Sequence, residues 1–208
     1  MTTYAIIDFE TTGLSPDHGD RATEVAAVIV RGGQIVDRYQ SLINPRRPIP
    51  YYVQELTGIT EGMVRNAPDA KQVMQELHQR IGHIPLVAHN ASFDRKFLDC
   101  EYQRAGLTRS TEFACSLLLA RRIYPQLRSH KLGELVRQLR LPTAGVHHRA
   151  MADAEMTTHL ITHMISELQT QGLSAVTHDL MRKLQGLPRL GLSKFIASCA
   201  AARCAGAA

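Results

Sequence analysis

Hydrophobic and polar residues follow two different periods along this chain, and the changes of period mark its expected elements. Apolar runs from Tyr4 to Phe9, Glu24 to Arg31 and Gln34 to Ile43 predict three strands. Gly32-Gly33 separates the last two runs, which predicts a hairpin. Leu86-Val87-Ala88 predicts a further short strand. The first three strands follow one another directly, as in a meander.

Helical spacing appears after this meander. Asp69 followed by Gln72 resembles a capping box, and Val73, Leu77 and Ile81 follow at helical intervals. Further helices are expected over Phe93–Ala105, Cys115–Tyr124, Leu132–Leu139 and Ala150–Gln169. Because a meander is followed by alternating strand and helices, the pattern predicts an α/β fold with helices packed on a sheet.

The chain of 208 residues fits one compact domain with a small addition. A break at Gln171-Gly172 divides it into an expected domain over 1–170 and a C-terminal helical appendage over 171–208. In the appendage, apolar residues between Leu173 and Leu184 predict one helix. The alanine-rich end from Ala200 to Ala208 is expected to be frayed.

Charge and composition narrow the class of partner. The formal net charge is +5 and the pI is near 9.2, which favours a polyanionic partner such as nucleic acid. Between residues 121 and 140 the charged residues are Arg121, Arg122, Arg128, Lys131, Arg137 and Arg140, against Glu134. This stretch fits either a solvated face or a surface that contacts phosphates.

The expected location is the cytoplasm, without a membrane segment. No apolar run approaches the roughly 18 residues that span a bilayer, and no basic start followed by an apolar stretch indicates secretion. The four cysteines show no CxxC pair and no spacing typical of a disulfide framework, which fits a reducing compartment.

The hydrophobic pattern does not account for the positions of four carboxylates and one histidine. Side chains alternate faces in a strand, so Asp8 and Glu10 point to the same side at the end of an apolar strand. Asp153 lies on the core-facing stripe of its helix, and Asp94 begins another helix. Each has an ordinary alternative, a solvated strand end or an aspartate that favours a helix N-terminus. His148, five residues before Asp153, is by itself an ordinary loop residue.

Together these residues suggest one chemistry. Carboxylates gathered in a folded interior repel one another unless a cation lies among them, and divalent metal ions serve that purpose. A nearby histidine is suited to accept a proton from water. The set therefore predicts metal-dependent hydrolysis of a phosphodiester.

Three segments resemble the three exonuclease motifs of the DEDDh branch of the DnaQ-like 3′–5′ exonucleases. They are Asp8-x-Glu10-Thr11-Thr12-Gly13, His89-Asn90-Ala91-Ser92-Phe93-Asp94 and His148-x-Ala150-x-x-Asp153. Leu56-Thr57-Gly58-Ile59-Thr60 also resembles a connecting segment of bacterial members. The resemblance covers about Thr3 to Leu168, and three ordered motifs with correct internal spacing make it specific.

This resemblance implies a ribonuclease H-like fold, a mixed five-stranded sheet flanked by helices. It implies two Mg²⁺ or Mn²⁺ ions held by Asp8, Glu10, Asp94 and Asp153, with His148 as the general base. It also implies that the terminal nucleotide contacts residues of the first two motifs: Thr11, Thr12, Leu14, His89 and Phe93.

The resemblance leaves the substrate open. Within the family, the chain resembles the proofreading epsilon subunit of bacterial DNA polymerase III. This resemblance favours single-stranded 3′ ends of DNA, a role in proofreading or repair, and a polymerase subunit as candidate partner. Ribonuclease T and oligoribonuclease share the motifs, so an exoribonuclease is the alternative. A nucleic-acid-binding module without activity is disfavoured because all five chemical residues are present.

Overall fold

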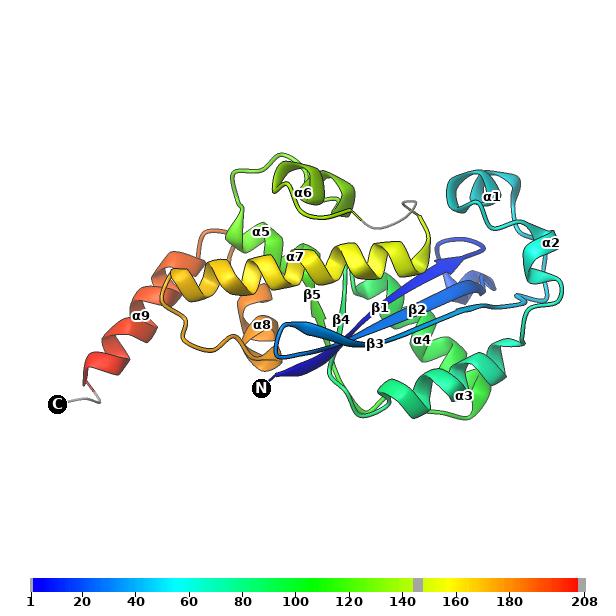
Figure 1. Cartoon of the computed structure of the whole chain (residues 1–208), viewed down its shortest axis with the longest axis horizontal. Coiled ribbons are helices and arrows are strands. Elements are labelled where there is room, and N and C mark those ends of the chain that lie inside the picture. Colours follow the sequence, from blue (N-terminus) through cyan, green and yellow to red (C-terminus); the bar gives the residue numbers. More distant parts are fainter. Residues whose placement is uncertain (1, 144–147, 206–208) are drawn as a thin grey trace.

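The computed structural model describes residues 2–143 and 148–205, which form a sheet covered by helices on both faces (Figure 1). The strands are β1 (Thr3–Thr11), β2 (Ala22–Arg31), β3 (Gln34–Leu42), β4 (Leu86–Ala88) and β5 (Phe113–Cys115). Their order across the sheet is β3-β2-β1-β4-β5. β1, β2 and β3 pair antiparallel, whereas β4 pairs parallel to β1 and to β5. This is the mixed five-stranded sheet that the resemblance implies.

The helices follow the order of the chain. They are α1 (Tyr51–Thr57), α2 (Glu61–Val64), α3 (Ala70–Ile81), α4 (Ser92–Ala105), α5 (Ser116–Ile123), α6 (Leu132–Gln138), α7 (Ala150–Thr170), α8 (His178–Gln185) and α9 (Leu192–Ala205), with a 3₁₀ turn over Pro16–His18. Among the described helices, none is long and apolar enough to cross a membrane.

Alternation along β1 divides the core into two layers. Tyr4 and Ile6 belong to the cluster that includes α5, α6, α7 and α8, whereas Ala5, Ile7 and Phe9 belong to the cluster that includes α3 and α4. Because side chains alternate, Asp8 and Glu10 stand on the same face as Tyr4 and Ile6, which is the face that α7 crosses (Figure 1). The fold thus directs both carboxylates toward α7.

Of the two hydrogen bonds of the expected capping box at Asp69, the structure contains one. The Asp69 side chain accepts a hydrogen bond from the Gln72 amide at 2.9 Å, which satisfies a backbone donor that the first turn leaves unpaired. The Gln72 side chain bonds instead to Glu76, one turn further along the helix, at 3.1 Å. The helix therefore begins with a simple N-cap.

The sequence pattern does not predict three of the short elements, β5, α1 and α2. β5 has three residues and ends at Cys115, where the sequence predicts only a helix. Three residues are too few to show a strand period, and pairing with β4 is what defines them. Helices α1 and α2, of seven and four residues, follow a proline-rich segment that reads as a loop.

The first helix of the C-terminal appendage begins later than the sequence pattern predicts. Helix α8 begins only at His178, because the Thr177 side chain caps it by accepting from the Leu180 amide. Leu173 and Val176 precede it as buried residues of the same core as α7. Helix α9 continues to Ala205, and alanine is the best helix former. The fraying expected of the alanine-rich end stays a prediction. Residues 206–208 lie outside the described part.

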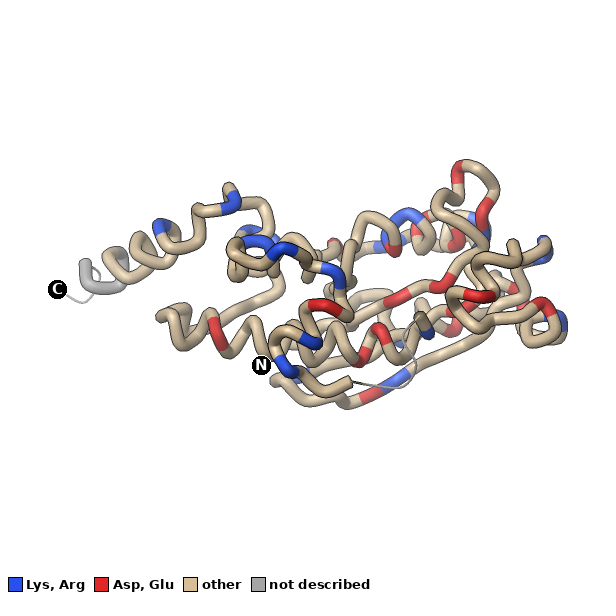
Figure 2. Tube along the Cα trace, turned by 90° about the horizontal axis from the view of Figure 1, so that it is seen from above, with Lys and Arg blue, Asp and Glu red and all other residues tan. Residues whose placement is uncertain are grey.

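α8 packs against the sheet rather than standing apart from it. The His178 ring lies 2.8 Å from the carbonyl oxygen of Leu86 in β4, and Met181 and Leu184 are fully buried. α9 instead projects away from the body (Figure 1). Figure 2 shows Lys and Arg marks along this last stretch, and beyond Asp179 the sequence has no acidic residue. The boundary at residue 170 stays a prediction.

Candidate active site

β1 and α4 bring three of the predicted carboxylates to one end of the sheet. Asp8 and Glu10 lie near the C-terminal end of β1, and Asp94 lies in the first turn of α4. The Phe9 amide donates a hydrogen bond of 3.1 Å to Oδ1 of Asp94, whose side chain is almost fully buried. This bond ties the start of α4 to the strand between Asp8 and Glu10.

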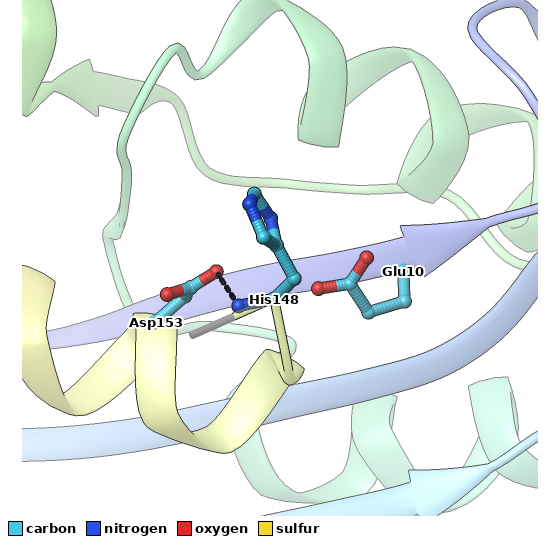
Figure 3. A group of neighbouring side chains, drawn as sticks. All are labelled: Glu10, His148 and Asp153. Carbon is cyan, nitrogen blue, oxygen red and sulfur yellow. Dashed lines mark hydrogen bonds between the residues drawn. The ribbon is translucent and has the colours of Figure 1, made fainter. Parts of the chain in front are cut away.

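The N-terminal turn of α7 and the segment just before it supply the other two predicted residues, Asp153 and His148. The ligand atoms of Glu10, His148 and Asp153 all lie within 4.8 Å of one another. Figure 3 shows the His148 imidazole projecting between the carboxylates of Glu10 and Asp153. The backbone amide of His148 lies 3.3 Å from Oδ2 of Asp153 and donates to it. His148 has a left-handed backbone, with φ of 65°, which is uncommon for a residue other than glycine.

Burial and mutual repulsion perturb this group of carboxylates. The pKa of Glu10 is raised to about 8, first by burial and then by the negative charges of Asp153 and Glu24. Burial also raises the pKa of Asp94 to about 7, against the opposing effect of the Phe9 amide. The pKa of Asp8 lies well above its usual range, first from burial and then from the charge of Asp94. The cluster is therefore poor at holding several negative charges by itself.

The chemistry of this donor set fits divalent cations. Hard cations such as Mg²⁺ and Mn²⁺ prefer carboxylate oxygens. Four carboxylates converge here, and burial followed by their negative charges raises the pKa values of Asp8, Glu10 and Asp94. A bound cation removes the repulsion that otherwise favours protonation. The residues present therefore suit the ions that the resemblance implies.

Glu24 and Arg149 also belong to the site, although the sequence pattern did not single them out. Glu24 on β2 is the register partner of Glu10 and is completely buried. Nε and Nη2 of Arg149 donate to its two carboxylate oxygens at 3.1 and 2.7 Å. A charged residue opening an apolar strand was the available signal, but its partner lies 125 residues away in sequence.

The loop after β1 explains the glycine of the first motif. A Cβ on Gly13 would overlap the carboxyl group of Asp20. Oδ1 of Asp20 lies 3.3 Å from the Thr12 hydroxyl, which in turn accepts from the Arg21 amide at 3.1 Å. The Thr11 hydroxyl donates to the carbonyl oxygen of Gly13 at 2.6 Å. Both threonine side chains therefore stabilise the loop.

The five predicted nucleotide contacts differ in what they offer to a ligand. Leu14 is 84% exposed, whereas Thr11 and Thr12 are buried. Phe93 is partly buried, and its ring packs against Phe97 with centroids 4.9 Å apart. These roles stay predictions; within the set, Leu14 offers a free apolar side chain at the end of β1.

His89 has both ring nitrogens engaged inside the protein. Nδ1 lies 2.8 Å from the Ser116 hydroxyl and Nε2 lies 3.0 Å from the carbonyl oxygen of His130. A carbonyl only accepts, so Nε2 carries the proton and Nδ1 accepts from the hydroxyl. Burial lowers the pKa of His89 to about 4, so the ring is neutral. Its contact with a nucleotide stays a prediction.

A cavity of about 410 Å³ opens beside the first turn of α4. Phe113, Leu117 and Leu118 give it apolar walls, and Arg95 and Arg121 line it as well. Within the part of the chain that the structure describes, neither guanidinium forms a hydrogen bond or ion pair. Two free cations beside apolar walls suit a ligand that carries both phosphate and planar apolar groups.

Exposed apolar side chains on α1 were not anticipated from the sequence. Tyr51, Tyr52 and Leu56 are 74%, 65% and 54% exposed. Figure 1 shows α1 at the same end of the molecule as the C-terminal end of β1, which carries Glu10 and is followed by Leu14. This end of the molecule therefore exposes two tyrosine rings, a type of side chain on which bases stack.

Comparison with known proteins identifies the family of this chain. A family profile described as Exonuclease matches residues 5–161. DNA polymerase III PolC-type of Bacillus subtilis is 37% identical over 186 residues, which cover 88% of this chain and 13% of that protein. The 3′–5′ exonuclease DinG of the same organism is 36% identical over 167 residues, 80% of this chain and 18% of that protein. The chain thus spans less than a fifth of these relatives.

Solved structures show the same fold. Exonuclease X, in complex with 5′ overhanging duplex DNA, superposes with a TM-score of 0.71 at 31% identity and covers 88% of this chain and 99% of that chain. The nuclease domain of 3′hExo, a DEDDh family member bound to rAMP, has a TM-score of 0.68 at 22% identity and covers 79% and 92%. With its five-stranded sheet and its cluster of carboxylates, the chain belongs to the DnaQ-like family of 3′–5′ exonucleases.

Proposed function

We propose that this protein is a DEDDh-type exodeoxyribonuclease that removes nucleoside 5′-monophosphates from 3′ ends of DNA. The observation that carries the proposal is the convergence of Asp8, Glu10, Asp94 and Asp153, with His148 among them. The raised pKa values of the first three reflect carboxylates that are buried and held together against their own repulsion. Such strain is typical of a site built for cations.

In the proposed reaction, Asp8, Glu10, Asp94 and Asp153 would hold two Mg²⁺ or Mn²⁺ ions. When bound, such ions stabilise negative charge on the attacking and leaving oxygens of a phosphoryl transfer. His148 would accept the proton of the attacking water as its oxygen bonds to phosphorus and the bond to the 3′ oxygen breaks. Neutral imidazole is suited to this step near pH 7.

The DNA strand would run from the carboxylates across two surfaces. Leu14 and the α1 residues Tyr51 and Tyr52 would stack on bases at the 3′ end. Arg95 and Arg121 would contact phosphates upstream, because they line a cavity beside the turn that carries Asp94. Of the basic residues between 121 and 140, Arg137 pairs with Glu134, and Arg122 bonds to the carbonyl oxygen of Leu187.

Two relatives favour DNA over RNA. Exonuclease X was solved with duplex DNA, and the PolC-type relatives are DNA polymerases by name. We propose a role in proofreading or repair, with a DNA polymerase subunit as candidate partner. 3′hExo, whose similarity shows the fold alone, was solved with rAMP, so RNA remains the alternative substrate.

Paired digestion tests the proposal. Matched single-stranded DNA and RNA, labelled at the 5′ end, are incubated with Mg²⁺, Mn²⁺ or EDTA, and Asp8→Ala serves as the inactive control. We expect a ladder that shortens from the 3′ end of DNA and disappears with EDTA and with the variant. Preference for RNA would assign the protein to the ribonucleases, and no cleavage of either would refute the proposed activity.

A further inference from the structure

A completely buried carboxylate joins the sheet to the segment that carries His148. Glu24 on β2 accepts four hydrogen bonds. Two come from Arg149, one from the Ala150 amide at 3.0 Å and one from the Gln40 side chain at 2.8 Å. Four donors, one of them charged, compensate a carboxylate that burial would otherwise make costly.

Three of these hydrogen bonds hold the N-terminus of α7, where Arg149 precedes the first helical residue, Ala150. Arg149 is the N-cap of α7, and its own side chain makes no capping hydrogen bond. The free amide of Ala150 is satisfied instead by Oε2 of Glu24. The N-terminus of α7 is therefore capped by Glu24 of β2, the residue that pairs with Glu10 of β1.

His148 immediately precedes this cap in a strained conformation. A left-handed backbone costs a non-glycine residue of the order of one kcal/mol, so surrounding contacts must maintain it. On one side, the His148 amide donates to Asp153 at 3.3 Å. On the other side, Arg149 and Ala150 are both held by Glu24. His148 thus lies between two anchored points.

We propose that Glu24 and Arg149 form a latch that positions the His148 imidazole relative to Glu10. The inference rests on the proposed function, in which His148 acts as general base. Glu24 and Glu10 are paired residues of adjacent strands, so the latch fixes the segment that carries His148 relative to the strand that carries Glu10. A displacement of about 1 Å in such a group reduces turnover by up to about 100-fold.

The latch is distinguishable from an ordinary tether of α7. Arg38 on β3 also joins α7 to the sheet, because its Nε lies 2.6 Å from Oε1 of Glu155. That pair is more exposed and lies two residues beyond Asp153 rather than beside His148. Arg38→Gln is therefore a matched control, which removes an ion pair between the sheet and α7 and leaves the latch intact.

The test compares Arg149→Gln, Arg149→Lys and Arg38→Gln for kcat, KM and Mn²⁺ affinity. For Arg149→Gln we expect kcat to fall about 10- to 100-fold, with KM within about 3-fold. Mn²⁺ affinity should be kept or strengthened, because a positive charge beside Glu10 is removed. Arg149→Lys should recover part of the loss. A kcat for Arg149→Gln equal to that of Arg38→Gln would overturn the latch.

Hydrogen exchange at the Ala150 amide tests the latch without any activity. This amide is bonded to Glu24, so we expect faster exchange in Arg149→Gln and Glu24→Gln than in the wild type and Arg38→Gln. The latch would be overturned if the Ala150 amide exchanged at the same rate in the wild type and in all three variants. If the wild type shows no metal-dependent cleavage, the proposed function fails, and the exchange rates still decide whether the latch holds the start of α7.

Discussion

Replacing Asp94 by Asn should stabilise the metal-free protein while removing its metal site. Asp94 is 2% exposed, and burial raises its pKa from 3.8 to about 7. A difference of about 3 pKa units corresponds to about 4 kcal/mol of unfolding free energy at pH 8. Part of the shift comes from the charge of Asp153, and Asp94 in turn raises the pKa of Asp8. Because these carboxyl groups titrate together, about 4 kcal/mol is the upper limit for Asp94 alone. Asn has nearly the same shape and still accepts from the Phe9 amide.

The sign follows from the direction of the shift. A carboxyl whose pKa is higher in the folded state contributes stability below about pH 4, and this stability is lost as the pH rises through about 7. Wild-type protein in EDTA should therefore become less stable between pH 5 and pH 8, whereas Asp94→Asn should lose less. For a chain of this size, the gap at pH 8 corresponds to about 8–16 °C in melting temperature at the upper limit.

Thermal unfolding in EDTA at pH 5 and pH 8 measures this gap. Asp99→Asn is the matched control on the same helix, because Asp99 is partly exposed and pairs with Arg109. Asp99→Asn should gain no thermal stability at either pH. Mn²⁺ should stabilise the wild type and leave Asp94→Asn unchanged. The reasoning is refuted if Asp94→Asn is no more stable than the wild type at pH 8, or gains equally at pH 5.

Three further predictions concern the base, the strand path and the core. His148→Ala should lower kcat by about 10²- to 10⁴-fold with little change in Mn²⁺ affinity measured by calorimetry; parallel loss of both would contradict its role as base. Replacing Arg95 and Arg121 by Ala should each reduce the salt dependence of binding to single-stranded DNA by about 0.7 in log–log slope; an unchanged slope would exclude them from the path. Leu160→Ala in the core should cost about 2–5 kcal/mol in urea unfolding, and a cost below about 1 kcal/mol would contradict its packing.

The fold was predictable where period and turn chemistry act locally. The hairpin over β2 and β3 follows from alternation around Gly32-Gly33, and the start of α3 follows from Asp69. β5 was not predictable, because three residues form a strand only through pairing with β4. The end of α9 has no turn or capping signal in the sequence, because an alanine-rich segment favours helix and also suits a chain terminus.

The site was predictable to the extent that its residues lie in short motifs. Asp8, Glu10 and Asp94 stand at recognisable spacings, and the structure brings them to one end of the sheet. Glu24 and Arg149 escaped prediction because their relation exists only in three dimensions. It depends on the register between β1 and β2 and on a contact across 125 residues of sequence.

The central claim is that these carboxylates form a metal centre for phosphodiester hydrolysis. The most direct measurement is anomalous diffraction from a crystal grown with Mn²⁺ and a nucleoside 5′-monophosphate. The account predicts two manganese peaks bounded by Asp8, Glu10, Asp94 and Asp153, with the phosphate beside them and His148 facing it. Manganese found only elsewhere, or no peak among these carboxylates, would contradict it.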